Sequence, residues 1–269
     1  MHRGEALDDF DKKDVLKIYF RSLFLEATWN FERIQNIGYA YLMLPVYKKT
    51  CSSIAEFQGL LKRSLGFFNT NYYMSGLLVG LLLNMEVKRF KKEGVNEEHI
   101  EAVKRNFMGP LAALGDNFFW ATLRPLAALL GIAGALIQEQ IWPHGLWGVL
   151  IFLLVFNIPH LILRFGGLWE GYRKGDAIIE EMQKINFQKV IREVRLLGMI
   201  FLGTYLPSWM FVNHQGEFMV MHRHSLLRLG TFLVALVWFR IGLTPTKLFC
   251  FLVIACIVAT YAGVVPPAH

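Results

Sequence analysis

Three long segments of the chain carry no Asp, Glu, Lys or Arg: 141–163, 196–216 and 248–269. An α-helix rises about 1.5 Å per residue and the hydrocarbon core of a bilayer is about 30 Å thick, so roughly 20 apolar residues span it. Each segment is therefore long enough to cross. The composition agrees, because 54% of the residues are apolar and only 18% are charged, which excludes intrinsic disorder. The sequence predicts an all-α, polytopic membrane protein.

Two further segments are expected to cross the membrane. Residues 226–243 carry Arg228 and Arg240 only near their two ends, where long side chains reach the headgroups. Residues 118–138 are interrupted only by Arg124 and Pro125. Together with the uncharged segments, these give about five transmembrane helices.

The rest of the chain is assigned to the same single membrane domain, residues 1–269. Residues 1–63 are expected to form amphipathic N-terminal helices, of which 14–25 either lies on the membrane surface or packs on a partner. Residues 64–138 are expected to form re-entrant and core helices, because the uncharged segment 64–85 begins with polar residues unsuited to lipid. Residues 139–269 hold transmembrane helices with a cytoplasmic linker at 164–195.

Basic residues set the expected orientation. The segments 86–105 and 164–195 are rich in Lys and Arg, whereas the intervening turn at 140–144 has neither, so the two segments are predicted to be cytoplasmic and the turn external. The first thirty residues lack a leading apolar run, so no cleavable signal peptide is expected and the N-terminus is predicted to stay in the cytoplasm. The same alternation places the C-terminus outside.

Two local helical features are also predicted. Asn96 is expected to cap a short cytoplasmic helix that begins with Glu97 and Glu98, whose charges favour the helix N-terminus. On a helix through 21–41, Glu26 and Asn30 would share one face.

The first candidate site is a polar run, Asn69, Thr70 and Asn71, inside the uncharged segment 64–85. Amide and hydroxyl side chains both donate and accept hydrogen bonds, which suits the hydroxyls of a sugar without the desolvation cost of a charge. The alternative is that Thr70 or Asn71 caps a helix that starts near Tyr72. The two roles are compatible, since transporters often place substrate groups at half-helix ends.

The second candidate site is Asp116, a carboxylate within an apolar stretch. An ionised carboxylate there costs roughly 3 kcal/mol unless it meets water, a partner or a ligand. Trp120 lies one turn away and Arg124 lies eight residues on. A carboxylate with an aromatic ring is typical of a sugar site, and a purely structural pair of Asp116 with Arg124 is the alternative.

The histidines do not indicate a metal centre. His214, His222 and His224 fall in a predicted outer loop, but His222 and His224 would point apart on a helix and Glu217 is the single nearby carboxylate. His160 is interpreted as a hydrogen-bonded structural residue within a span. Nucleophile-elbow, P-loop, dinucleotide and zinc-protease motifs are missing, so neither a cofactor nor catalysis by this chain alone is expected.

Four segments resemble one known family: RSLFLEATWNFERIQNIGYAYLMLPVYKK, FFNTNYYMSGLLVGLLLNME, MGPLAALGDNFFWATLRP and RFGGLWEGYRKGD. They are similar to the IID membrane subunit of mannose-family phosphotransferase (PTS) sugar transporters, over nearly the whole chain. The resemblance implies a bacterial inner-membrane subunit paired with a IIC subunit, the pair moving a hexose inward while a cytoplasmic IIB protein donates phosphate from its histidine. Phosphorylated histidines lie on soluble IIA and IIB parts, so neither His160 nor His214 inherits that role.

The same resemblance assigns a role to six positions. It implies that they shape the sugar path or the IIC contact: Asn69, Thr70, Asn71, Asp116, Trp120 and Arg124. The sequence departs from the family at Tyr72, where a proline is usual, and at residues 105–107 before the MGPLA segment. A divergent interaction or sensory membrane protein that no longer transports is therefore the alternative function.

Overall fold

The computed structural model describes residues 12–138, 146–211 and 245–261, together with some of those between 229 and 242. Every regular element in these residues is a helix, so the all-α prediction is confirmed. The chain forms two compact units, residues 1–200 and 201–269. The second unit contains α12 (Pro245–Tyr261), and α10 (Phe187–Phe211) begins in the first. Most of the predicted outer loop, with His214, His222 and His224, lies outside the described residues.

The first unit begins with four helices, α2 (Lys12–Ser22), α3 (Asn36–Thr50), α4 (Ile54–Ser64) and α5 (Ser75–Lys91). α2 is amphipathic as expected, and packs on α3 and α8 through Val15 and Ile18. Its other face exposes Leu16 and Phe20, so the helix combines a protein contact with an apolar outer surface.

The helix predicted through 21–41 is wrong. α2 ends at Ser22, and the chain then makes a series of turns until α3 begins. Asn30 and Ile34 exchange backbone hydrogen bonds at 2.9 and 3.0 Å, and Ile34 adopts a left-handed conformation with φ 61°. The Asn30 side chain also accepts from the Arg33 N–H, which favours a turn over a helix. Glu26 and Asn30 therefore do not share a helix face.

The segment 64–85 is irregular at its polar start, as expected, but its helix is shielded by protein. Residues 65–74 lie outside the helices, and α5 is buried along most of its length between the other elements of the first unit. The backbone of the polar stretch is thereby covered by protein, which is the condition for irregular backbone at membrane depth.

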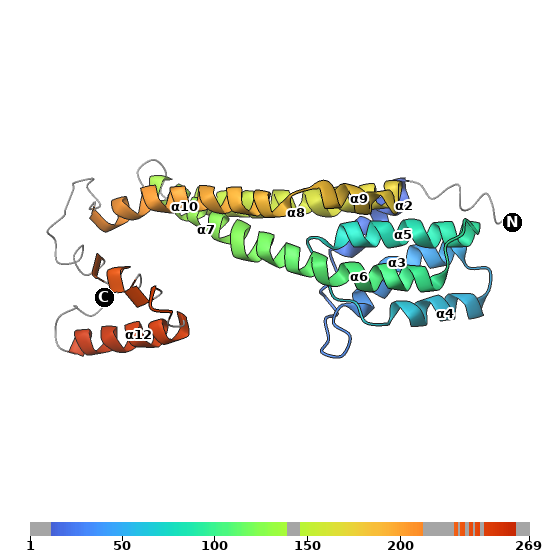
Figure 1. The fold of residues 1–269 in the computed structure, drawn as a ribbon, viewed down its shortest axis with the longest axis horizontal. Coiled ribbons are helices and arrows are strands. Elements are labelled where there is room, and N and C mark those ends of the chain that lie inside the picture. The colour runs from blue at the N-terminus through green and yellow to red at the C-terminus, as the bar shows by residue number, and fades with distance from the viewer. Residues whose placement is uncertain are drawn as a thin grey trace. The chain divides into compact units, whose positions relative to one another are not determined.

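α5 lies against the C-terminal half of α8 (Leu146–Lys174) (Figure 1), and the two backbones approach closely at glycines. A Cβ added at Gly76 or Gly80 would collide with the carbonyl oxygens of Arg164 or Leu168. A Cβ at Gly171 would lie 2.7 Å from the carbonyl oxygen of Leu77. Small residues four apart on both helices permit this contact, as they do between membrane helices generally.

Helix α6 (Glu97–Gly115) begins as predicted, since the Asn96 side chain accepts from the His99 N–H at 2.8 Å. It is longer than expected and continues directly into a π-helix, η1 (Asp116–Leu123), and α7 (Arg124–Gln138). Pro125 lacks the N–H that an α-helix would use, and the Arg124 N–H bonds the carbonyl of Phe119, five residues back. The proline and the wider turn thus occur together.

Two helical stretches in the described residues are long and apolar enough to cross a bilayer by length and composition, Glu97–Ala135 and Leu146–Lys174. They run side by side where α7 packs on the N-terminal half of α8 (Figure 1). The spans predicted at 196–216, 226–243 and 248–269 all include undescribed residues. Arg164 does not start a linker, because α8 continues to Lys174, and the chain then turns into the short helix α9 (Ala177–Lys184).

A buried ion cluster holds α4, α5 and α6 together. The Glu86 carboxylate is 1% exposed and pairs with Arg63 and, at 3.2 Å, with Arg89. Glu97 lies 3.2 Å from Arg63 and 3.0 Å from Arg89, so two cations meet two anions. Removing one partner of such a pair leaves an uncompensated buried charge.

The glycine contact predicts a sharp difference between two positions on α8. Gly171→Leu is expected to separate α5 from α8 and to destabilise the fold by roughly 1–3 kcal/mol or more, because the side chain must enter an already filled space. Gly166→Leu is the matched control, since a Cβ there meets nothing within 4 Å. Thermal unfolding of both variants in detergent, followed by Trp fluorescence, measures the difference, and equal melting temperatures would refute the close contact.

The ion cluster gives a second prediction. Glu86→Ala should lower the free energy of unfolding by roughly 3 kcal/mol, because the half-buried Arg63 and Arg89 then lose their central anion and keep only the more exposed Glu97 in common. Glu170→Ala, which removes a more exposed carboxylate paired with Arg173 and Lys174, should change it by less than about 1 kcal/mol. Denaturant titration of the two variants tests this ratio, and similar losses would mean that Glu86 is not the centre of the cluster.

Candidate functional site

The structure joins the two candidate clusters through one hydrogen bond. The Asn71 amide donates to Asp116 at 2.8 Å, and its carbonyl accepts from the backbone N–H of Tyr73 at 3.0 Å. Asn71 is buried, whereas Asp116 is exposed. Gly115 makes the approach possible, because a Cβ there would overlap the Asn71 side chain. An amide and a carboxylate that are 45 residues apart in the sequence thus form one polar pair.

The predicted alternative of an ion pair between Asp116 and Arg124 is wrong. The Arg124 guanidinium instead lies over the Trp120 ring, 4.9 Å from its centroid, as in a cation–π contact. Asp116 makes no ion pair within the described part of the chain. Asp116, Trp120 and Arg124 are all exposed on the single chain, so their polar groups remain open to a ligand or a second subunit.

Asn69 and Thr70 have different surroundings. Thr70 is buried, and the Gln35 side chain clamps its backbone by accepting from its N–H at 3.0 Å and donating to its carbonyl at 2.8 Å. Its hydroxyl has no hydrogen-bond partner in the described residues. Asn69 is exposed and its N–H contacts the Met108 sulfur at 3.4 Å. Neither Thr70 nor Asn71 is the N-cap of α5, which is Met74 without a side-chain bond.

One side chain of α10, Arg195, bonds the π-helix at two residues. Arg195 donates to Asn117 at 3.1 Å and to Thr122 at 3.4 Å. The Thr122 hydroxyl donates to the carbonyl of Asn117, five residues back, and so satisfies an acceptor within the wider turn. Asp116 therefore lies on a helical turn that Arg195 holds at Asn117 and Thr122.

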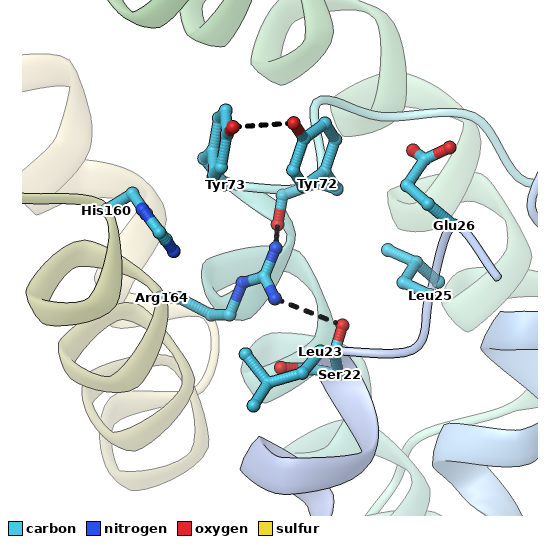
Figure 2. A pocket seen from close by; sticks show the side chains of 8 residues that line it. All are labelled: Ser22, Leu23, Leu25, Glu26, Tyr72, Tyr73, His160 and Arg164. Atoms are coloured by element: carbon cyan, nitrogen blue, oxygen red, sulfur yellow. Dashed lines mark hydrogen bonds between the residues drawn. The ribbon is translucent and has the colours of Figure 1, made fainter. Parts of the chain in front are cut away.

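Two tyrosines, Tyr72 and Tyr73, lie beside this cluster and also line a pocket of about 540 Å³. The Tyr72 hydroxyl donates to that of Tyr73 at 2.6 Å, and both rings lie near Trp120, with centroid distances of 6.3 and 6.0 Å. Both tyrosines also line the pocket, where Figure 2 shows them above Arg164.

The sequence patterns missed Arg164 as a site residue. It is 3% exposed and donates to the carbonyl oxygens of Ser22 at 3.2 Å and Tyr72 at 2.5 Å (Figure 2). His160, one turn earlier on α8, is also buried and packs on the Tyr73 ring at 4.7 Å. One signal was available, because Arg164 is the first charged residue after a long apolar run, and ionisable residues in or next to spans are often functional.

No group of three or more His, Cys, Asp or Glu side chains suited to a metal occurs in the described residues. His214, Glu217, His222 and His224 lie outside them. The polar side chains that line two pockets in the described region are of mixed types, including Arg, Lys, Glu, Asn, Tyr and His, which suit hydrogen-bonding ligands.

Comparison with known families decides the identity. Residues 9–265 match the family model described as the PTS system mannose/fructose/sorbose family IID component. The chain belongs to this family. It is therefore the membrane IID subunit of a mannose-family phosphotransferase system, and the resemblance seen in the sequence is confirmed.

Named relatives agree with this assignment. The IID chain is 33% identical over 202 residues to the fructose permease IID component of Bacillus subtilis, covering 75% of this chain and 71% of that protein. It is 34% identical over 200 residues to the sorbose-specific EIID component of Klebsiella pneumoniae, covering 74% and 71%. It is 32% identical over 203 residues to the mannose-specific EIID component of Escherichia coli K12, covering 75% and 70%.

Solved structures show the same fold. A structure described only as a membrane protein matches with a TM-score of 0.76 and 26% identity, over 95% of this chain and 98% of that one. A chain of the mannose transporter ManYZ, solved by cryo-electron microscopy with microcin E492, matches with a TM-score of 0.57 and 25% identity over the same shares. The expectation of an α-helical membrane protein is therefore confirmed.

Proposed function

We propose that this IID subunit assembles with a IIC subunit in the cytoplasmic membrane of a bacterium and forms with it the path for a hexose. Uptake is coupled to phosphorylation by the cytoplasmic IIB protein, which receives its phosphoryl group from IIA. The match of residues 9–265 to the IID family supports this role, as do relatives named for fructose, sorbose and mannose. The ManYZ transporter supports pairing with a second membrane subunit.

The observation that carries the proposal is the open polar face of η1. Asp116 keeps an exposed carboxylate inside a membrane-length helix, and its described bond is to the neutral amide of Asn71. Trp120 and Arg124 continue this face and are also exposed. A carboxylate next to the hydrocarbon core needs water, a partner or a ligand to offset its desolvation. A IIC subunit and a sugar would supply the hydrogen bonds that compensate for the desolvation of Asp116.

The six positions divide into two kinds of role in this proposal. Asp116, Trp120 and Arg124 face the sugar path or the IIC contact directly, and buried Asn71 acts through its hydrogen bond to Asp116. Buried Thr70 holds the polar turn in place through Gln35, and Asn69 lies exposed beside it. The chain itself is non-catalytic, because phosphoryl transfer belongs to IIA and IIB.

The proposed topology keeps the expectations from the charge pattern. The N-terminus and the basic residues after α8 lie in the cytoplasm, and the C-terminus lies outside. Both compact units act together as one membrane subunit, which agrees with the family match across both of them.

Asp116 provides the test. Asp116→Ala should reduce hexose uptake to background, because it removes the carboxylate of the open face, while copurification with IIC stays at the level of the unmodified chain. Asp116→Asn should restore little uptake if the charge is required. Uptake of radiolabelled mannose, fructose and sorbose by cells expressing the whole system measures this.

Asp176→Ala is the matched control for that experiment, since Asp176 is exposed in the turn after α8. It should transport normally. Normal uptake by Asp116→Ala would remove Asp116 from the site, and loss of IIC copurification would assign it to the subunit contact instead of the sugar.

A further inference from the structure

The pocket below Tyr72 and Tyr73 contains a buried cation without a matching anion. Arg164 bonds two backbone carbonyl oxygens, and its Nε has no partner within the described residues. It forms no ion pair with any described carboxylate. Carbonyl oxygens offset only part of the free-energy cost of burying a guanidinium. An anionic group would neutralise its charge and accept its remaining hydrogen bonds.

A second buried group faces the same pocket with an unused atom. His160 lines the pocket, and its Nδ1 forms no hydrogen bond of normal geometry, although the backbone of Phe156, one turn earlier on α8, lies close to the imidazole. His160 is 9% exposed and lies one helical turn from Arg164, on the same wall of the pocket (Figure 2). Two buried nitrogen-bearing side chains with incomplete hydrogen bonding line one pocket, and such side chains suit the oxygen atoms of a ligand.

The position of Arg164 along α8 indicates where that ligand comes from. Arg164 lies about 27 Å from Leu146 along the helix, at 1.5 Å per residue. That length is close to the full hydrocarbon thickness of about 30 Å, so Arg164 falls at the level of the headgroups. Leu23 lines the pocket and is exposed, as are the neighbouring Phe20 and Phe24. These side chains offer an apolar path from the pocket to the acyl-chain region.

The opposite wall of the pocket carries a negative charge. Glu26 accepts a hydrogen bond from the neutral Gln35 amide and forms no ion pair with a described residue. Figure 2 shows Glu26 on the side away from His160. A ligand with one negative and one positive group therefore matches the pocket better than a ligand with a negative group alone.

We propose that this pocket binds the zwitterionic headgroup of an aminophospholipid. The phosphate lies on Arg164 and His160, the ammonium lies toward Glu26 beside the Tyr72 ring, and the acyl chains follow the exposed apolar side chains at the end of α2. The bound lipid acts as a structural ligand that ties α2 to α8, and this role is independent of the sugar path.

Native mass spectrometry of the purified, delipidated full chain tests this directly. Phosphatidylethanolamine should bind at one site at least about tenfold more tightly than phosphatidylglycerol, a difference of about 1.4 kcal/mol. Soluble phosphoethanolamine and inorganic phosphate should not compete at equal concentration, because they lack acyl chains. Equal affinity for the two lipids, or full competition by inorganic phosphate, would overturn the proposal.

Variants assign the site. Arg164→Gln should lose the tight phosphatidylethanolamine site, whereas Arg173→Gln, an exposed position on the same helix, should retain it. Glu26→Gln leaves the buried cation in place and should reduce the preference for phosphatidylethanolamine over phosphatidylglycerol to near equality. Unchanged binding by a folded Arg164→Gln, or an unchanged preference in Glu26→Gln, would contradict the proposal. Because Glu26 is only half-buried, its variant keeps the test decisive if Arg164→Gln fails to fold.

Discussion

The contact between α5 and α8 is the constraint on which the rest of the first unit depends. Gly80 and Gly171 let two backbones approach where any larger side chain would intervene. This approach brings the carbonyl of Tyr72, just before α5, within reach of Arg164 on α8. In a bilayer, where apolar burial between helices gives little net gain, such close packing supplies much of the association. The polar turn at the start of α5 is fixed by this arrangement.

The fold separates polar groups that are satisfied within the chain from those that remain open. Glu86 is buried between two arginines, and its ion cluster joins three helices, so its role is structural. Asp116 and Arg164 differ, because the first keeps an exposed carboxylate and the second a buried guanidinium without an ion pair among the described residues. Open charges of this kind require a second molecule. Arg164 lines the pocket with Tyr72 and Tyr73, whereas Asp116 does not line it. We therefore propose separate partners for the two charges, a sugar or IIC subunit for Asp116 and a lipid for Arg164.

Local patterns predicted much of the fold and part of the site. The helix cap at Asn96 was predictable because it depends only on Asn96 and the next few residues. The length of the apolar segments indicated a membrane protein. The bond between Asn71 and Asp116 was not predictable from spacing, since it spans 45 residues and depends on Gly115 and the π-helix. The burial of Arg164 also escaped prediction, because a basic residue that ends an apolar run is equally typical of a solvated linker. Long-range packing decided both cases.

The central claim is that the exposed polar face of η1 is covered by a second subunit. In a chain with its native cysteines replaced, Ala121→Cys places a thiol on this face, and Ser52→Cys places one on the exposed turn before α4. Labelling with a soluble maleimide in detergent, with and without copurified IIC, measures cover at each position. Strong protection of position 121 by IIC with unchanged labelling at position 52 is the predicted result, and equal labelling of position 121 in both samples would contradict the account.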